Sequence, residues 1–164
     1  MTMFANHGAL TKHNHLIEGI NSRLDGLQAA ILSVKLPYLH DWTESRIANA
    51  KKYNEGLIGL GDLQLPKARP NSKHTYHLYV IKTKHRDALK VFLESHGVDT
   101  AIHYPVALPL MPAYSRFGAD AQEYPVGSDH VNKILSIPMY PELCDEQINY
   151  IIKVIRSFYA NMAC

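Results

Sequence analysis

The sequence predicts an α+β (α/β) fold: a small, mostly antiparallel or mixed sheet of about three strands, packed by helices and preceded by a long helix pair. Two observations carry this prediction. Between His74 and Pro105 the apolar period changes from two residues to a helical spacing, and a short apolar segment follows. After Asp145, isoleucines recur at helical spacing and define one apolar face.

Composition places the chain among ordinary globular proteins. Of its 164 residues, 46% are hydrophobic and 20% are charged, which suffices for one core. The formal net charge of +2 comes without a run of basic residues, so we expect small-molecule or protein partners rather than nucleic acid. Cys144 and Cys164 lack metal-type spacing, and no apolar run approaches the roughly 20 residues that span a bilayer. We therefore expect a cytoplasmic protein without membrane contact.

Residues 1–20 show no clean period and are expected to form an irregular lead-in to a domain over residues 21–164. Asn21 or Ser22 can cap the first long helix, with Asp25 in its first turn. Apolar residues extend around much of this helix, so it needs cover on more than one side. Another subunit or a domain outside this sequence would supply that cover.

A second long helix follows the first. Pro37 interrupts the helical run, and apolar residues keep helical spacing over residues 39–60. Gly59 and Gly61 are expected to end this helix, because glycine tolerates left-handed backbone. Residues 62–73 contain two prolines and few long apolar side chains, which predicts an extended connector.

The middle of the chain predicts a β-α-β unit. Residues 75–82 alternate in polarity and are rich in aromatic and β-branched side chains, as in a half-buried central strand. Residues 84–96 have helical spacing, and Gly97 stands where a left-handed residue would end that helix. Residues 98–102 then predict a second short strand. Both strands should belong to one sheet, with the helix covering one side.

The last third combines a long loop with short regular elements. Four prolines within residues 104–127 preclude a long helix, and the aromatic residues there favour an ordered loop. Residues 128–133 predict a short helix and residues 134–137 a third strand. The final helix, capped at Asp145, should lie across the sheet.

The usual catalytic and metal-binding motifs are missing. The sequence contains no phosphate-binding or dinucleotide-binding glycine loop, no nucleophile elbow and no His-Glu-x-x-His. His7, His13 and His15 have no nearby cysteine or clustered carboxylates, so we predict no metal site. His74 and His77 are three residues apart on a predicted strand and would point to opposite faces. We interpret His77 as a structural residue.

Two polar groups remain as candidate binding sites. His103-Tyr104-Pro105 stands where the second predicted strand runs out into the long loop, a common place for binding groups. Asn21 and Arg23, with the free amides of a helix N-terminus, could hold a phosphate or carboxylate. For both groups a purely structural role, such as a cap with a surface ion pair, is an equal alternative from the residues alone.

Three strings in order carry a family resemblance: GINSRLDGLQAAILSVKLPYL, HTYHLYVIKTKHRDALKVFLESHGVDTAIHYP and LSIPMYPELCDEQINYII. Over about residues 6–159 the chain resembles the C-terminal part of the DegT/DnrJ/EryC1/StrS sugar aminotransferases. The resemblance implies the small C-terminal domain of a fold-type I enzyme dependent on pyridoxal 5'-phosphate, with its interdomain helices, in a homodimer. The complete enzyme would transfer an amino group from glutamate to a nucleotide-linked keto-sugar, for cell-surface polysaccharide, lipopolysaccharide or antibiotic sugars.

The resemblance also assigns roles to the candidate residues. The family's Asn-x-Arg motif matches Asn21 and Arg23, which implies contacts in trans to the cofactor phosphate of the other subunit. The family's Ile-His-Tyr-Pro motif matches the stretch that contains His103 and Tyr104, which implies contacts to the sugar or phosphate of the substrate. Relatives often continue with Pro-Leu-His, and this sequence has Pro109 in place of that histidine.

The same resemblance implies that catalytic parts lie elsewhere. In the family the lysine that holds the cofactor, the acidic partner of its ring nitrogen and the stacking aromatic all precede the equivalent of Met1. An amine must bind the cofactor's carbonyl for transamination, so we expect this chain to be a fragment that is inactive alone. The alternative is a non-catalytic dimerisation or sugar-binding module that retains the family fold.

Overall fold

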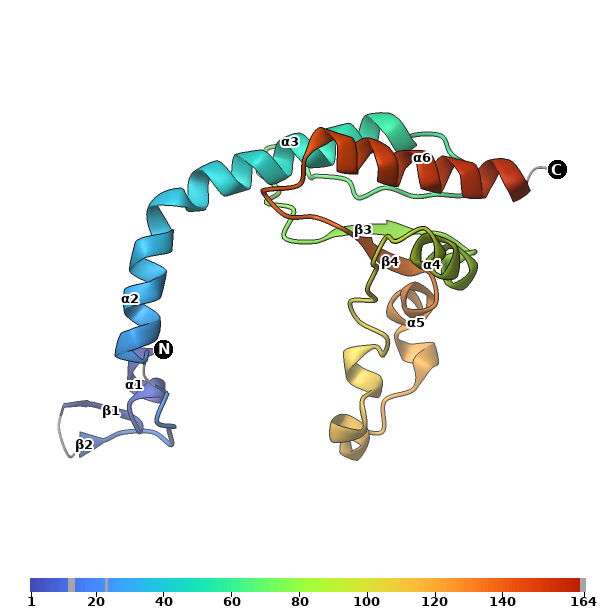
Figure 1. Cartoon of the computed structure of the whole chain (residues 1–164). Coiled ribbons are helices and arrows are strands. Elements are labelled where there is room, and N and C mark those ends of the chain that lie inside the picture. The colour runs from blue at the N-terminus through green and yellow to red at the C-terminus, as the bar shows by residue number, and fades with distance from the viewer. Residues whose placement is uncertain (12–13, 23, 163–164) are drawn as a thin grey trace. The chain divides into compact units, whose positions relative to one another are not determined.

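The computed structural model describes residues 1–11, 14–22 and 24–162, and the chain divides into two compact units, Met1–His40 and Asp41–Cys164 (Figure 1). Three residues named in the sequence analysis, His13, Arg23 and Cys164, lie outside the described residues. The first unit is small, and the second contains the hydrophobic core.

The first unit begins with short regular elements. Helix α1 (Thr2–Ala5) is followed by strands β1 (Ala9–Thr11) and β2 (Asn14–His15), which pair antiparallel. An isolated bridge joins Asn6 to Asn21 and closes this segment on itself. The first twenty residues therefore contain a helical turn and a small hairpin within otherwise irregular backbone.

Helix α2 (Gly26–Lys35) begins later than predicted. Its N-cap is Asp25, whose carboxylate accepts hydrogen bonds from the backbone N–H groups of Leu27 at 2.9 Å and Gln28 at 3.2 Å. The prediction that residue 21 or 22 caps this helix was wrong. A carboxylate one residue before the first turn reaches two free N–H groups and also faces the positive end of the helix dipole.

Pro37 separates two helices, as predicted. It lies in the 3-10 turn η1 (Leu36–Tyr38), which joins α2 to helix α3 (Leu39–Leu57). A proline in an α-helix removes one backbone hydrogen bond, which favours this tighter turn. After α3, Gly59 adopts a left-handed φ of 72°.

A pair of antiparallel strands forms the centre of the second unit. Strand β3 (Tyr79–Lys82) pairs with β4 (Ile134–Ile137) in the register Tyr79↔Ile137. The prediction of a strand over residues 134–137 is confirmed. Alternate β3 side chains, Tyr79 and Ile81, are fully buried, which is the period-two burial of a strand with one face on a core.

Isolated bridges extend this ladder on both edges. Gln64 from the connector pairs antiparallel with the last residue of β3, and Ala101 pairs antiparallel with Ser136 of β4. The pairing order is therefore Gln64, β3, β4, Ala101. The predicted β-α-β segments do share one ladder, but β4 lies between them.

Two predicted strands are shorter than expected. The first was predicted over residues 75–82 and covers only the last four of these, since Tyr76 has a left-handed φ of 47° that interrupts extended backbone. The second, predicted over residues 98–102, pairs only at Ala101. Alternating polarity indicated the extended direction of these segments but not where a partner strand was available.

Helices and turns complete the second unit. They are helix α4 (Arg86–Ser95), the 3-10 turns η2 (Leu108–Leu110), η3 (Pro112–Phe117) and η4 (Ala121–Glu123), and helices α5 (Pro125–Val131) and α6 (Asp145–Met162). Gly97 adopts the predicted left-handed φ, at 72°, after α4. Among the described residues, none of the helices has the length and apolar character needed to cross a membrane.

Helices α3 and α6 lie side by side over the strands (Figure 1). They are in close contact at Gly56, where an added Cβ would come within 2.6 Å of the Ile152 side chain. Arg156 of α6 also donates a hydrogen bond to the Gly56 carbonyl at 3.1 Å. The core beneath them combines both helices with the ladder and α4; its fully buried large side chains include Tyr53, Leu57, Tyr79, Ile81, Leu89, Leu93, Leu135, Ile148 and Ile155.

A polar cluster joins the end of α6 to the end of β3. The Tyr159 hydroxyl lies 2.8 Å from Thr83 Oγ1 and 3.0 Å from the Asp62 carboxylate. Asp62 also accepts hydrogen bonds from the Thr83 hydroxyl and the Lys84 N–H, each at 2.7 Å. Partial burial alone would raise the pKa of Asp62, but these hydrogen bonds outweigh it and lower that pKa below its ordinary value.

Replacement of Tyr159 by phenylalanine should destabilise the fold. The variant keeps the ring in the core but leaves Thr83 and Asp62 short of one hydrogen bond, for an expected loss of about 1–2 kcal/mol in the free energy of unfolding. Urea denaturation followed by circular dichroism would measure it. Tyr150→Phe is the matched control, because that hydroxyl is on the same helix and bonds only the His96 carbonyl at an exposed position. Equal losses in both variants would contradict the prediction.

Acid should weaken the Asp62 cluster. A carboxyl whose pKa is lowered by folding stabilises the folded state above its unfolded pKa of about 3.9, and that contribution disappears as the pH falls through the folded pKa. The unfolding free energy should therefore fall between about pH 5 and about pH 2. Asp62→Asn should lack this part of the pH dependence. If the unfolding free energies of the parent chain and of Asp62→Asn changed in parallel with pH, this prediction would be wrong.

Candidate functional site

His103 is fixed by its contact with the neighbouring strand. Its Nδ1 atom lies 2.9 Å from the Ser136 hydroxyl of β4, and its ring meets that of Tyr104 edge-on at 5.6 Å between centroids. Tyr104 is 68% exposed, while His103 is half-buried. A fixed imidazole beside an exposed phenol offers two neighbouring hydrogen-bonding groups.

The long loop after this pair is built from three 3-10 turns. Pro109, which replaces the histidine of the family pattern, lies inside η2. The loop exposes apolar side chains as well, among them Leu108 at 62% and Phe117 at 67%, with the Arg116 guanidinium 4.5 Å above the Phe117 ring. Proline offers no side-chain donor or acceptor, so position 109 can make no polar side-chain contact.

Asn21 lies in the other unit. Its backbone takes part in the bridge to Asn6, and its side chain is exposed. A carboxamide on the surface can donate to a phosphate oxygen without loss of an internal partner. The structure brings His103 and Tyr104 together, and it describes Asn21 within a different unit from theirs.

The described lysines show how well the chain fits a cofactor held as an imine. Many form ion pairs with carboxylates: Lys51, Lys52, Lys73, Lys82, Lys90 and Lys133. The others in the described ranges, at positions 35, 67, 84 and 153, are exposed. Within residues 1–11, 14–22 and 24–162, then, no lysine is buried in a pocket suited to this role.

Two of these ion pairs share Asp129 and form a three-residue cluster beside the sheet. Asp129 of α5 accepts from Lys133 and, at 3.0 Å, from Lys82 of β3. These two hydrogen bonds lower the pKa of Asp129 to about 2. The cluster lies at the surface, where its two ion pairs tie α5 to the strand.

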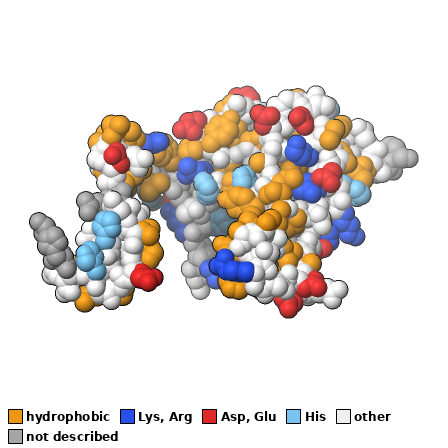
Figure 2. Space-filling model, turned by 90° about the horizontal axis from the view of Figure 1, so that it is seen from below, with side chains coloured by type: hydrophobic (Ala, Val, Ile, Leu, Met, Phe, Trp, Pro, Cys, Tyr) orange, Lys and Arg blue, Asp and Glu red, His pale blue; other side chains and the backbone are white. Residues whose placement is uncertain are grey.

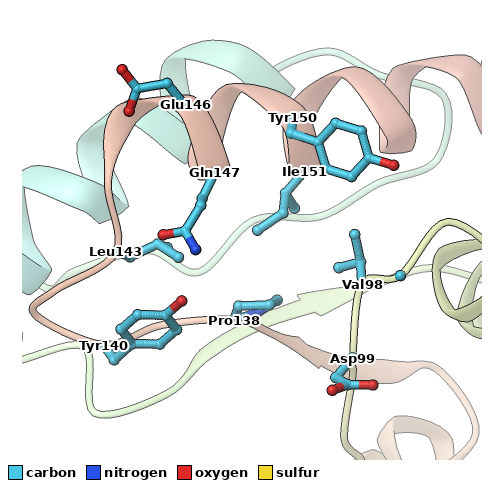
Figure 3. A pocket seen from close by; sticks show the side chains of 10 residues that line it. Val98, Asp99, Pro138, Tyr140, Leu143, Glu146, Gln147, Tyr150 and Ile151 are labelled. Atoms are coloured by element: carbon cyan, nitrogen blue, oxygen red, sulfur yellow. The ribbon is translucent and has the colours of Figure 1, made fainter.

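A separate apolar cavity of about 560 Å³ lies under the first turns of α6 (Figure 3). Val98 and Ile151 point into it from opposite sides, and the Gln147 side chain reaches in from the helix. The Gln147 carbonyl oxygen already accepts from the Cys144 N–H at 3.1 Å. None of the predicted site residues lines this cavity.

Hydrophobic side chains are exposed over much of the face seen in Figure 2. Helix α2 is the strongest case, because it contains no buried residue at all. The exposed fractions of Leu27, Ile31 and Val34, which share one stripe, are 72%, 52% and 71%. A surface of this kind on a helix indicates an interaction partner.

The fold is that of the corresponding part of solved sugar aminotransferases. The chain superimposes on S. venezuelae DesV in complex with a ketimine intermediate with a TM-score of 0.88 and 36% identity, covering 96% of this chain and 42% of that one. A DegT DnrJ EryC1 StrS aminotransferase from Brucella abortus gives a TM-score of 0.83 at 34% identity, with the same coverage.

The chain belongs to the DegT/DnrJ/EryC1/StrS aminotransferase family, whose sequence pattern it matches over residues 1–156. It is 35% identical to the dTDP-3-amino-3,4,6-trideoxy-alpha-D-glucose transaminase of Streptomyces venezuelae, covering 96% of this chain and 42% of that protein. It is 40% identical to the UDP-N-acetyl-3-dehydro-alpha-D-glucosamine 3-aminotransferase of Acidithiobacillus ferrooxidans, covering 92% of this chain and 40% of the relative. The chain thus spans about two fifths of the length of these proteins.

Sequence reasoning named His103 and Tyr104 as candidates but did not identify Ser136, the buried residue that contacts His103. Ser136 stands between apolar residues in a strand, and a serine there gave no signal of a partner 33 positions away in the sequence. The only hint was a polar side chain in an otherwise apolar four-residue run. Long-range hydrogen bonds of this kind become visible only with the strand register.

Proposed function

We propose that this chain forms the C-terminal part of an aminotransferase that uses pyridoxal 5'-phosphate to move an amino group from glutamate to a keto group on a nucleotide-linked sugar. Its contribution is to bind and orient, through phosphate contacts made in trans within a homodimer and through contacts to the sugar nucleotide. The products would be amino sugars for cell-surface polysaccharide, lipopolysaccharide or antibiotics, made in the cytoplasm.

One observation carries the proposal: nearly the whole chain matches about two fifths of the length of proteins named as dTDP-sugar and UDP-sugar transaminases in sequence, and a similar share of a solved structure in fold. Those names support a transaminase over a non-catalytic module, whereas the exposed Tyr104 beside His103 is compatible with both. The nucleotide and the sugar differ among these relatives, so the proposal specifies the class of substrate only.

Each site residue has a defined part in this scheme. When bound, the cofactor supplies an electron sink through which the amino group is moved. The exposed Asn21 carboxamide donates to the cofactor phosphate of the partner subunit, and Arg23 neutralises phosphate charge near it. His103 and Tyr104 hold oxygen atoms of the sugar or its diphosphate, which fixes the keto carbon in place.

The amine that binds the cofactor carbonyl belongs to another part of the enzyme in this scheme. Treatment of the 164-residue chain with pyridoxal 5'-phosphate and then borohydride should leave no stoichiometric adduct on any one lysine, because its described lysines are ion-paired or exposed. Intact-protein mass spectrometry would measure this.

The complete gene product is the matched comparison for that experiment. It should form one adduct, on a lysine outside this sequence, and should transaminate a UDP- or dTDP-linked 3-keto sugar with glutamate. A single stoichiometric adduct on the 164-residue chain would overturn the proposed division of roles. A complete product that binds nucleotide sugar without transamination would favour the binding module instead.

The apolar stripe of α2 should make the chain self-associate. In the proposed enzyme this helix is covered by the partner subunit and by the part of the enzyme outside this sequence. Without that cover, its leucine and isoleucine side chains favour contact with a second copy. Sedimentation velocity should show a dimer or a larger species.

Ile31→Lys should shift that distribution toward monomer, since a charge in the middle of the stripe opposes burial. Val91→Lys is the control, because Val91 is similarly exposed, at 66%, but lies on α4 in the other unit. A monomeric parent chain, or equal effects of both substitutions, would argue against the role of α2.

A further inference from the structure

The side chain of Ser136 places a hydroxyl in the buried part of the second unit, and the backbone pairing does not say which group accepts its proton. It lies in the middle of β4, 5% exposed, between Leu135 and Ile137 in the core. Its backbone N–H and C=O are both used in the bridge to Ala101, at 2.7 and 3.1 Å. Burial of a hydroxyl costs free energy unless its proton is hydrogen-bonded, so the partner of that proton is informative.

The bridge itself directs His103 toward this hydroxyl. Residues opposite each other in an antiparallel pair project to the same side, so the Ala101 and Ser136 side chains share a face. His103 follows two residues later, at a bend in the chain, and its Nδ1 lies 2.9 Å from the Ser136 Oγ.

We propose that Ser136 is a positioning residue that fixes the tautomer of His103. Within the described part of the chain, His103 Nδ1 is the hydrogen-bond partner found for the Ser136 hydroxyl. If the imidazole donated from Nδ1, the buried hydroxyl proton would have no acceptor. The hydroxyl therefore donates to Nδ1, and the ring proton resides on Nε2.

This tautomer determines what His103 can bind. An imidazole with its proton on Nε2 presents a hydrogen-bond donor on the side away from Ser136. Sugar hydroxyl, keto and diphosphate oxygens are acceptors, so the donor suits a nucleotide sugar. The inference that His103 donates to a nucleotide sugar rests on the proposed function. The tautomer itself rests only on the contact between His103 and Ser136.

A second serine and histidine pair in the same unit has the opposite arrangement. The Nδ1 atom of His96 lies 2.8 Å from the Phe92 carbonyl oxygen, which can only accept, so its ring proton must be on Nδ1. Ser95 Oγ is 3.1 Å from that same Nδ1. The Ser95–His96 pair is exposed, and it provides an internal control for Ser136–His103.

The test uses the 164-residue chain labelled with ¹⁵N-histidine, with long-range ¹H–¹⁵N spectra recorded at about pH 9, where free imidazole is neutral. His103→Gln and His96→Gln assign the two rings. We expect the proton of His103 on Nε2 and that of His96 on Nδ1. Ser136→Ala should move the Nδ1 resonance of His103, since that nitrogen loses its donor, and Ser136→Thr, which keeps the hydroxyl, should restore it.

Ser95→Ala should leave both tautomers unchanged, because the Phe92 carbonyl still holds His96. A His103 ring that carries its proton on Nδ1, or a Nδ1 resonance that does not respond to Ser136→Ala, overturns the inference whatever reaction the protein catalyses.

The substrate half of the inference is tested in the complete gene product with UDP-N-acetylglucosamine as probe. The probe should shift the His103 Nε2–H resonance. In transamination of a UDP-linked 3-keto sugar with glutamate, Ser136→Ala should lower kcat/KM about tenfold, as expected for loss of one oriented hydrogen bond. Ser136→Thr should recover it. If the ring proton is on Nε2 but its resonance does not shift when UDP-N-acetylglucosamine is added, the proposed contact of His103 with substrate is wrong. The assignment of the tautomer would then still hold.

Discussion

The second unit depends on strand β4 being hydrogen-bonded on both edges. Its four residues join β3 on one side and Ala101 on the other, and two of its side chains, Leu135 and Ile137, enter the core. A short strand that is paired on both sides leaves few backbone groups without partners, which is the main requirement for burying it. The helices α3, α4 and α6 then cover the apolar side chains that this ladder presents.

The same strand connects the fold to the candidate site. Because Ala101 is fixed opposite Ser136, the residues that follow leave the sheet from a defined point, and His103 reaches the Ser136 hydroxyl from there. The site therefore combines an exposed rim with a buried support from a different part of the sequence. Packing around Leu135 and Ile137 limits how far that support can move.

Local pattern predicted the elements whose signals are local. The strand at residues 134–137, the interruption at Pro37 and the left-handed Gly97 were all correct, since each follows from period or from backbone sterics. The strands predicted at residues 75–82 and 98–102 were too long, because their ends depend on which partner backbone is within reach.

In the candidate site, too, features with a local signal were predicted and contacts between distant segments were not. Its predicted residues, Asn21, Arg23, His103 and Tyr104, were candidates from their places in the predicted elements, and only the motif resemblance distinguished a functional role from a structural one. The buried Ser136 was missed, as was the cluster of Asp62, Thr83 and Tyr159. Those contacts join segments far apart in the sequence, so they require the fold to be known before they can be identified.

The order of pairing also bears on how the chain is made. Strand β4 has partners on both edges, yet it is the last segment of the ladder in the sequence. Gln64, β3 and Ala101 all precede it. During translation these segments emerge from the ribosome with an incomplete set of neighbours, and the ladder closes only after residue 137 has left the exit tunnel. Such late, long-range closure slows folding and leaves unpaired edges open to other chains until synthesis has passed β4.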